Sequence, residues 1–378
     1  MNFIEIENKH YILASSALAD QKTIVLKEGD TFALFEVHGD IFQIPSGSLG
    51  VYHNGTRYLS KMELTINGLK PLLLSSFPRE DNQMIIVDLT NPDLSLDNDN
   101  AVLRGTIHIS RSKFLWQGAY HERIRFINFG LEPTQFHVQL KYDADFADIF
   151  EVRGTTRQKK GQKLSGKQSD NGVTFSYNGL DNINRETTIQ LNPKPQSIDR
   201  DGVRYDNIKM NPKDEFIIEV SASFAERGQA IEVIPFDTAK NAMNTYLEKV
   251  SSYCAGILTS NDQFNEWINR SKNDLITMTT RTAHGLYPYA GIPWYSTAFG
   301  RDGILTAFEC LWVEPELAKG VLRYLAQTQA KAFNDFQDAE PGKIFHETRS
   351  GEMAELGEIP FKLYYGTIDA TPLFISLA

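Results

Sequence analysis

The chain has 378 residues, of which 41% are hydrophobic and 23% are charged, a composition typical of a globular protein with a substantial core. A formal net charge of −10 disfavours nucleic acid and anionic membrane surfaces as partners. Two cysteines, Cys254 and Cys310, are too few for a disulfide framework, and Cys310 is expected to be a reduced thiol inside a helix.

The length suggests two or three domains. The N-terminus lacks the basic-then-apolar pattern of a signal peptide. No apolar stretch reaches the roughly 18 residues that span a bilayer. We therefore expect a cytoplasmic protein without a membrane partner.

Residues 1–236 show the pattern of antiparallel sheet. Two Asn-Gly pairs, at 54–55 and 67–68, lie between alternating apolar runs, which is the strongest short-range signal of a hairpin. The second pair is expected to join KMELTI to LKPLLLSSF. Many further short runs without intervening helices predict a two-sheet antiparallel β-sandwich. The Lys-, Gln- and Gly-rich stretch over 157–170 is expected to be an exposed loop.

From Asp237 the hydrophobic period changes to 3.6 residues, which indicates helices. Asp237 or Thr238 is the expected N-cap of the first helix. A second helix is expected to begin at Ser260 with a capping box, and another at Pro315. The pattern predicts a multidomain β + α chain, with a sandwich over 1–236, a helical linker over 237–259 and a helical domain over 260–378.

The segment AGIPWYSTAFGRDGILTAFECLW, from Ala290 to Trp312, leads an aromatic loop into an Arg-Asp pair at the start of a helix. Arg301 and Asp302 would therefore lie where free backbone N–H groups and the helix dipole favour a carboxylate. With rings from Trp294, Tyr295 and Phe299, such a pair can bind a neutral polyol. The alternative is an N-cap aspartate beside a surface arginine. The following apolar residues are expected to form one buried stripe, namely Ile304, Leu305, Phe308, Leu311 and Trp312.

A long loop over 333–367 is rich in acids and aromatic residues, and loops of this length are usually functional or disordered. Most of its acids are expected to be solvated. Glu347, beside His346, and Asp369, at the start of the last helix, are the two exceptions that we favour as site residues. A metal site formed by His346 and these acids is a further alternative, but one histidine without a second at ligand spacing supports it only weakly. The last helix ends in an apolar run without a cap, which suggests an interrupted domain.

Several long, collinear motifs resemble those of glycogen debranching enzymes. The runs GVYHNGTRYLSKMEL, LLLSSFPREDNQMIIVDLTNPDL and KYDADFADIFEVRG resemble the bacterial-type N-terminal domain of these enzymes. The runs AGIPWYSTAFGRDGILTAFECLWV and EPGKIFHETRSGEMAELGEIPFKLYYGTIDATPLF resemble the opening of the amylo-α-1,6-glucosidase catalytic domain. The resemblance extends over nearly the whole chain.

The resemblance implies a β-sandwich followed by an (α/α)₆ toroid and hydrolysis of α-glucosidic bonds. It implies that Arg301 and Asp302 hold hydroxyls of the terminal glucose, and that Trp294, Tyr295, Glu347 and Asp369 line the same pocket. We expect no cofactor and no metal. The residues from Ser260 onward are too few for twelve helices, so the toroid is expected to be incomplete.

The resemblance also implies an inverting mechanism, which needs a general acid and a general base about 6.5–9.5 Å apart. No Trp-Lys-Asp segment of the kind that carries the acid in this family occurs in the chain. Both catalytic carboxylates are therefore expected beyond Ala378, and this chain alone is expected to be inactive. The alternative is that Glu347 and Asp369 are themselves the pair.

Three functions remain open. The first is that of a glycoside hydrolase fragment acting on glycogen-like α-glucans or small α-glucosides. The second is a non-catalytic glycan-binding protein, and the third is an interaction module built on the sandwich. The uncapped apolar last helix favours the first. The oligomeric state is open.

Overall fold

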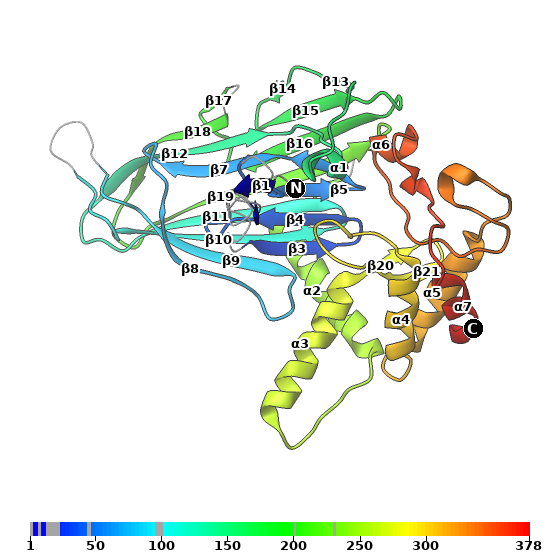
Figure 1. The fold of residues 1–378 in the computed structure, drawn as a ribbon. Coiled ribbons are helices and arrows are strands. Elements are labelled where there is room, and N and C mark those ends of the chain that lie inside the picture. The colour runs from blue at the N-terminus through cyan, green and yellow to red at the C-terminus, as the bar shows by residue number, and fades with distance from the viewer. Residues whose placement is uncertain are drawn as a thin grey trace.

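The computed structural model describes residues 3–6, 9–12, 23–43, 47–94, 101–199, 202–229 and 232–378. Strands dominate the chain as far as Glu226, and helices dominate from Phe236 onward (Figure 1). Every strand pairing in the described ranges is antiparallel. The predicted antiparallel β-sandwich followed by helices is confirmed.

The described strands form three larger sheets and two small hairpin pairs. The nine-stranded sheet has the order β13 (Gln162–Lys163), β15 (Gly172–Asn178), β16 (Asn184–Asn192), β19 (Glu215–Glu226), β11 (Ala119–Asn128), β10 (Ile107–Trp116), β9 (Met84–Thr90) and β8 (Leu72–Pro78), with β14 (Lys167–Ser169) paired to β15. One four-stranded sheet has the order β17 (Ser197–Asp199), β18 (Gly202–Met210), β12 (Thr134–Asp143) and β7 (Lys61–Ile66). The other has the order β3 (Ile24–Glu28), β4 (Thr31–Phe35), β5 (Gly50–His53) and β6 (Thr56–Leu59). The two hairpin pairs are β1 (Phe3–Ile6) with β2 (Lys9–Ile12) and β20 (Thr279–Thr282) with β21 (Gly285–Pro288).

The sandwich core lies between the nine-stranded sheet and the two four-stranded sheets. Burial alternates along β10 and β12, as expected for strands with one inward face. Ile107 and Ile109 of β10 and Val138 and Leu140 of β12 are fully buried in one continuous cluster with side chains of the other strands. Burial of this alternating apolar face is the main source of stability in this part of the chain.

The two Asn-Gly turns have different outcomes. Asn54 and Gly55 adopt positive φ values of 45° and 74° and close the β5–β6 hairpin, as predicted. The predicted hairpin at Asn67-Gly68 is wrong, because β7 pairs with β12 and β8 pairs with β9 rather than with each other. That turn carries the chain from one sheet to another. The dipeptide specifies the local reversal, whereas the strand partners are set by the core.

The helical part begins on the outer face of the large sheet. The helices are α1 (Ile149–Val152), α2 (Phe236–Tyr253), α3 (Asp262–Met278), α4 (Gly300–Glu309), α5 (Pro315–Gln327), α6 (Glu352–Glu355) and α7 (Ala370–Leu377), with 3-10 turns at η2 (Asp335–Gln337) and η3 (Pro360–Lys362). Phe236 of α2 packs edge-on against Phe114 of β10 with ring centroids 5.1 Å apart. The predicted domain boundaries stay predictions. None of the helices in the described ranges has the length and hydropathy of a membrane-spanning segment.

Two predicted helix caps are wrong. Pro235 precedes α2, and the carboxylate of Asp237 binds Arg123 at 2.7 Å instead of capping the helix. Asn261, rather than Ser260, caps α3 by accepting a hydrogen bond from the backbone N–H of Phe264 at 3.1 Å. Asn261 thus satisfies a backbone N–H group of α3 as the predicted cap would have done, whereas no side chain caps α2.

The buried face of α4 is also different from the predicted stripe. Gly300, Gly303, Ile304 and Ala307 are buried, whereas Leu305 and Phe308 are exposed and Trp312 is 69% exposed. Small residues face inward because α4 packs closely on Tyr287 of β21, on Phe345 and on Ala370 of α7. Cys310 lies at the C-terminal cap of α4 as a half-buried free thiol, not inside the helix.

Candidate functional site

The start of α4 is held by an extended segment from the acid-rich loop. The backbone N–H of Gly300 donates to the carbonyl of His346 at 2.9 Å, and Phe299 forms a β-bridge with Glu347. A Cβ on Gly300 would lie 2.0 Å from the carbonyl oxygen of Phe345, so only glycine allows this approach. Glu347 is bridged on its other side to Tyr364. The segment around Glu347 therefore lies between the start of α4 and the segment that leads to α7.

Three charged residues meet at the N-terminal ends of α4 and α7, and we call Arg301, Asp302 and Asp369 the charged cluster. Nη1 of Arg301 donates to Oδ2 of Asp369 at 3.2 Å, and Nε of Arg301 lies 3.7 Å from Oδ2 of Asp302. Their side chains are 46%, 39% and 35% exposed for Arg301, Asp302 and Asp369 respectively. Asp302 lies in the first turn of α4, where the helix dipole favours its charge.

Asp369 precedes α7, as predicted, but its side chain makes no capping hydrogen bond. The hydroxyl of Thr367 and the guanidinium of Arg301 both donate to the Asp369 carboxylate, and these bonds lower its pKa below the ordinary value. The carboxylate is therefore ionised at neutral pH. It fixes the Arg301 side chain and leaves accessible oxygen atoms beside it.

Glu347 forms a second, more buried group with Arg349. Nε of Arg349 donates to Oε2 of Glu347 at 2.7 Å, and their side chains are 6% and 11% exposed respectively. Nη1 of Arg349 donates to the carbonyl of Trp294 at 2.6 Å. The guanidinium also lies 5.4 Å from the ring centre of Phe299. Glu347, Trp294 and the start of α4 are thus joined through Arg349.

Aromatic rings surround this segment. Tyr295 packs edge-on against Phe299 at 5.7 Å, and Phe299 packs edge-on against His346 at 5.5 Å. His346 also packs against Tyr364 at 6.2 Å. From the sandwich, the guanidinium of Arg153 lies 5.6 Å from the ring centre of Tyr295. Tyr295 remains partly exposed, whereas Trp294 packs against the sandwich core.

The predicted site residues thus fall into two neighbouring groups. Arg301 contacts both Asp302 and Asp369 at the surface, while Glu347 is bound to Arg349 and through it to the backbone of Trp294. The prediction missed Arg349. Its position two residues after Glu347 in an extended segment places both side chains on one face, and that spacing could have indicated it.

Exposed carboxylates beside a guanidinium suit the binding of neutral hydroxyl groups. A carboxylate accepts hydrogen bonds from hydroxyls, and a guanidinium donates to them. Nε of Arg301 is outside hydrogen-bond distance of Asp302, so the Asp302 carboxylate keeps its accepting capacity.

No group of three or more metal-ligating side chains gathers in the part of the chain that the structure describes. Arg349 also lines a hollow of about 150 Å³ between the sandwich and the helical part.

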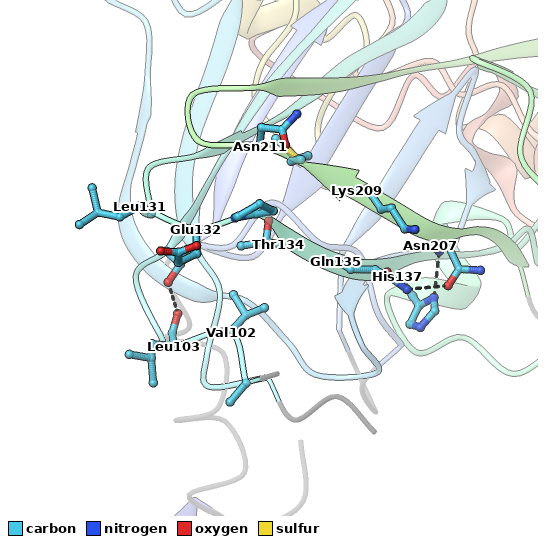
Figure 2. Close-up of a pocket in the computed structure, with 15 residues that line it drawn as sticks. Val102, Leu103, Leu131, Glu132, Thr134, Gln135, His137, Asn207, Lys209 and Asn211 are labelled. Atoms are coloured by element: carbon cyan, nitrogen blue, oxygen red, sulfur yellow. Dashed lines mark hydrogen bonds between the residues drawn. The ribbon is translucent and has the colours of Figure 1, made fainter. Parts of the chain in front are cut away.

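A larger hollow lies elsewhere. A groove of about 1000 Å³ crosses the end of the sandwich away from the helices, with Leu103 and Leu131 at one end (Figure 2). At the other end, Nδ1 of His137 lies 3.2 Å from the backbone nitrogen of Asn207. None of the predicted site residues lines this groove.

Comparisons with known proteins identify the fold. The profile described as the N-terminal domain of some glycogen debranching enzymes matches residues 26–221, from β3 to β19. No curated protein sequence matches the chain significantly. A protein described as a kojibiose phosphorylase from the human microbiome is 12% identical, with a TM-score of 0.53 over 84% of this chain and 48% of that chain.

A bacterial glucoamylase complexed with acarbose is also 12% identical, with a TM-score of 0.54 over 94% of this chain and 55% of that chain. The chain therefore spans about half the length of these two solved structures, and it matches the N-terminal part of each. At this identity the likeness shows the fold alone. Because the profile covers more than half of its residues, the chain belongs to the family defined by the N-terminal domain of glycogen debranching enzymes.

Proposed function

We propose that the chain serves α-glucoside hydrolysis of the amylo-α-1,6-glucosidase type, with glycogen-like α-glucans or small α-glucosides as substrates. In this role Arg301 and Asp302 bind hydroxyls of a terminal glucose unit. The observation that carries the proposal is the charged cluster, which two separate segments build at the starts of α4 and α7. Membership in the debranching-enzyme family supports the substrate class.

The chemistry of the charged cluster fits recognition of a neutral sugar. Arg301 is held by Asp369 at 3.2 Å, so its remaining N–H groups point in a fixed direction. Asp302 is held by the first turn of α4 and accepts hydroxyl protons. The partly exposed ring of Tyr295, on the neighbouring loop, offers an apolar surface to a sugar face.

The same contacts disfavour Glu347 and Asp369 as the catalytic acid and base. A general acid needs a raised pKa, whereas the pKa of Asp369 is lowered. Glu347 is buried against Arg349, which occupies its carboxylate. We therefore propose that Asp369 and Glu347 organise the binding site, and that the inverting acid and base of the whole protein are other residues, outside 1–378.

The proposal is tested by calorimetric titration of the chain with acarbose. The variant Asp302→Asn should bind acarbose about 10- to 150-fold more weakly, because a hydrogen bond to a charged group contributes about 1.5–3 kcal/mol. Glu309→Gln, at the exposed C-terminal end of the same helix, is the matched control and should bind like the wild type. The unfolding midpoint of each variant is measured alongside.

Equal affinity of wild type and Asp302→Asn would remove Asp302 from the site, and no binding by the wild type would refute the proposed function. Release of glucose from a limit dextrin that Glu347→Gln abolishes would instead establish Glu347 as a catalytic residue.

A further inference from the structure

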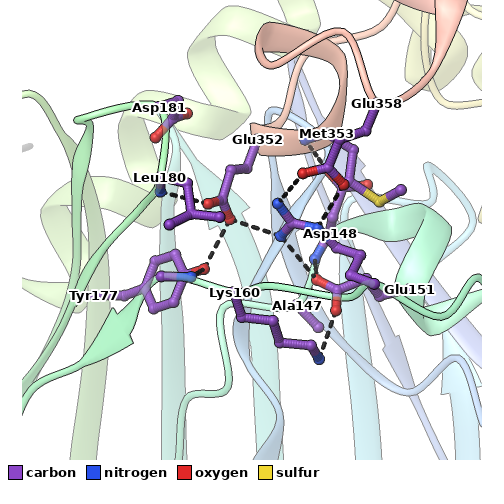
Figure 3. Close-up of polar contacts among 12 residues, drawn as sticks. Ala147, Asp148, Glu151, Lys160, Tyr177, Leu180, Asp181, Glu352, Met353 and Glu358 are labelled. Carbon is purple, nitrogen blue, oxygen red and sulfur yellow. Dashed lines mark hydrogen bonds and ion pairs between the residues drawn. The ribbon is translucent and has the colours of Figure 1, made fainter.

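The segment that follows Arg349 leaves the helical part and binds the sandwich. Figure 3 shows where it arrives: Glu352 of α6 lies beside Tyr177 of β15 and Leu180 in the turn after that strand, and Glu358 lies near Glu151 of α1. Arg157, from the stretch after α1, lies at the centre with a side chain that is only 1% exposed. The sequence predicted this arginine to lie in an exposed loop, and that prediction is wrong for Arg157.

Arg157 binds both glutamates. Its Nη1 donates to Oε2 of Glu352 at 2.9 Å. Its Nε and Nη2 donate to the two carboxylate oxygens of Glu358 at 2.8 and 2.7 Å, a bidentate contact. Nη1 also lies 3.5 Å from Oε2 of Glu151 on α1. One arginine of the sandwich thus joins two carboxylates from the acid-rich loop, and we call Arg157, Glu352 and Glu358 the clamp.

Glu352 has further partners on the sandwich. The hydroxyl of Tyr177 donates to its Oε2 at 2.7 Å, and the backbone N–H of Leu180 donates to its Oε1 at 2.6 Å. Burial raises the pKa of Glu352, but its hydrogen bonds to Arg157, Leu180 and Tyr177 outweigh burial and lower the pKa overall. Glu352 is therefore ionised, fully hydrogen-bonded and fixed in orientation.

A second contact holds the same segment. Oδ1 of Asp148 accepts from the N–H of Phe150 in α1, and Oδ2 accepts from the N–H of Met353 at 3.1 Å. Gly351 adopts a φ of +111°, and a Cβ there would lie 2.6 Å from Oδ2 of Asp148. One aspartate thus caps helices of both parts of the chain.

The clamp is continuous with the candidate saccharide site. The guanidinium of Arg349 lies 5.4 Å from the ring centre of Phe150, the residue that Asp148 fixes. Phe150 stacks on Phe361 at 5.7 Å, and Phe361 packs edge-on against Tyr364 at 5.3 Å. Tyr364 is bridged to Glu347. The segment over 350–358 is therefore anchored between two stretches that build the site.

Removal of the arginine would reverse the electrostatics of this contact. Glu151, Glu352 and Glu358 would face one another with Lys160, which pairs with Glu151 at the surface, as the nearby cation. Glu352 would keep its hydrogen bonds from Tyr177 and Leu180 but would lose its charged partner, and a buried carboxylate without a countercharge is disfavoured. The segment would then separate from the sandwich, and the stretches on either side of it would lose their anchor.

We propose that Arg157 is a positioning residue for the saccharide site, acting from the sandwich by holding the segment over 350–358 so that Glu347 and Arg349 keep their orientation. This inference rests on the proposed function of the charged cluster. It gives the sandwich a defined part in sugar binding without a contact between Arg157 and the sugar.

The test compares Arg157→Gln and Arg157→Lys with Arg123→Gln. Arg123 is a matched control because it also bridges two carboxylates, Glu219 and Asp237, and also joins the sandwich to the helical part. Amide hydrogen exchange reports opening of the segment at Met353, Glu355 and Glu358, and calorimetry reports acarbose affinity. The unfolding midpoint reports general destabilisation.

We expect Arg157→Gln to speed exchange at these three amides about tenfold or more and to weaken acarbose binding about tenfold. Arg157→Lys keeps the positive charge but cannot form the bidentate contact with Glu358, so it should give an intermediate effect. The same measurements are made on Arg157→Lys if Arg157→Gln does not fold. Arg123→Gln should lower the unfolding midpoint without changing either readout.

Unchanged amide exchange over 350–358 in both Arg157 variants would show that Arg157 does not hold this segment on the sandwich. Faster exchange with unchanged acarbose affinity would overturn the positioning role and leave the proposed function intact. Failure of the wild type to bind acarbose would instead overturn the proposed function, and the positioning role with it.

Discussion

Replacing Glu347 with glutamine removes the carboxylate that faces Nε of Arg349 at 2.7 Å. The Arg349 side chain is only 6% exposed, and its other contacts are the carbonyl of Trp294 and the rings of Phe150 and Phe299. Breaking a buried ion pair by removing one partner costs about 3–5 kcal/mol. The amide oxygen of glutamine can still accept the hydrogen bond and recovers about 1 kcal/mol. We therefore expect a loss of about 2–4 kcal/mol.

Native-state hydrogen exchange measures this loss where it occurs. The amides of Gly300 and Tyr364 bond to the carbonyls of His346 and Glu347 at 2.9 and 3.0 Å, so both exchange when this segment opens. Glu347→Gln should lower their opening free energy by the amount above. Glu355→Gln is the control, because Glu355 pairs with Lys362 at the surface and the pair should contribute about 0–1 kcal/mol. The reasoning fails if both variants lower the opening free energy equally.

Two further predictions concern the backbone and pH. Gly300→Ala places a Cβ 2.0 Å from the carbonyl oxygen of Phe345 and should destabilise the start of α4 by about 1–3 kcal/mol. The control Gly291→Ala places its Cβ in open space and should not destabilise α4. Equal amide exchange rates at α4 in the two variants would contradict this prediction. Burial raises the pKa of Asp148 from 3.8 to about 6, so the folded chain keeps a proton that the unfolded chain releases over that range. The contribution of Asp148 to stability is therefore full below about pH 4 and falls by up to about 3 kcal/mol as the pH rises to 6. The difference in unfolding free energy between wild type and Asp148→Asn should follow this fall, and a constant difference would show that Asp148 does not titrate in this way.

Local signals predicted the fold well where the decisive contacts are local. Alternating strands, the Asn54-Gly55 hairpin and the helix from Pro315 are all present. The Asn67-Gly68 hairpin failed because strand partners depend on distant core residues. The α4 stripe failed because close packing on Tyr287 selects small residues, so glycine and alanine face inward and larger apolar residues do not.

In the candidate site, too, the sequence predicted the residues whose positions depend on local structure and missed the contacts between distant residues. The Arg301–Asp302 pair at a helix start and Asp369 before the last helix lie where the sequence placed them, because each depends on the start of its own helix. The family resemblance implied that these residues line one pocket, whereas the contacts of Arg301 with the two aspartates come from the structure. The link from Arg157 to Glu352 and Glu358 joins residues about two hundred positions apart, and no pattern along the chain indicates it.

The most direct test of the saccharide site is a crystal structure of the chain grown with acarbose. The account predicts a sugar ring over the N-terminal end of α4, with hydroxyl oxygens at about 2.7–3.0 Å from the carboxylate of Asp302 and the guanidinium of Arg301. Acarbose bound only in the groove at the far end of the sandwich, with the charged cluster empty, would contradict it.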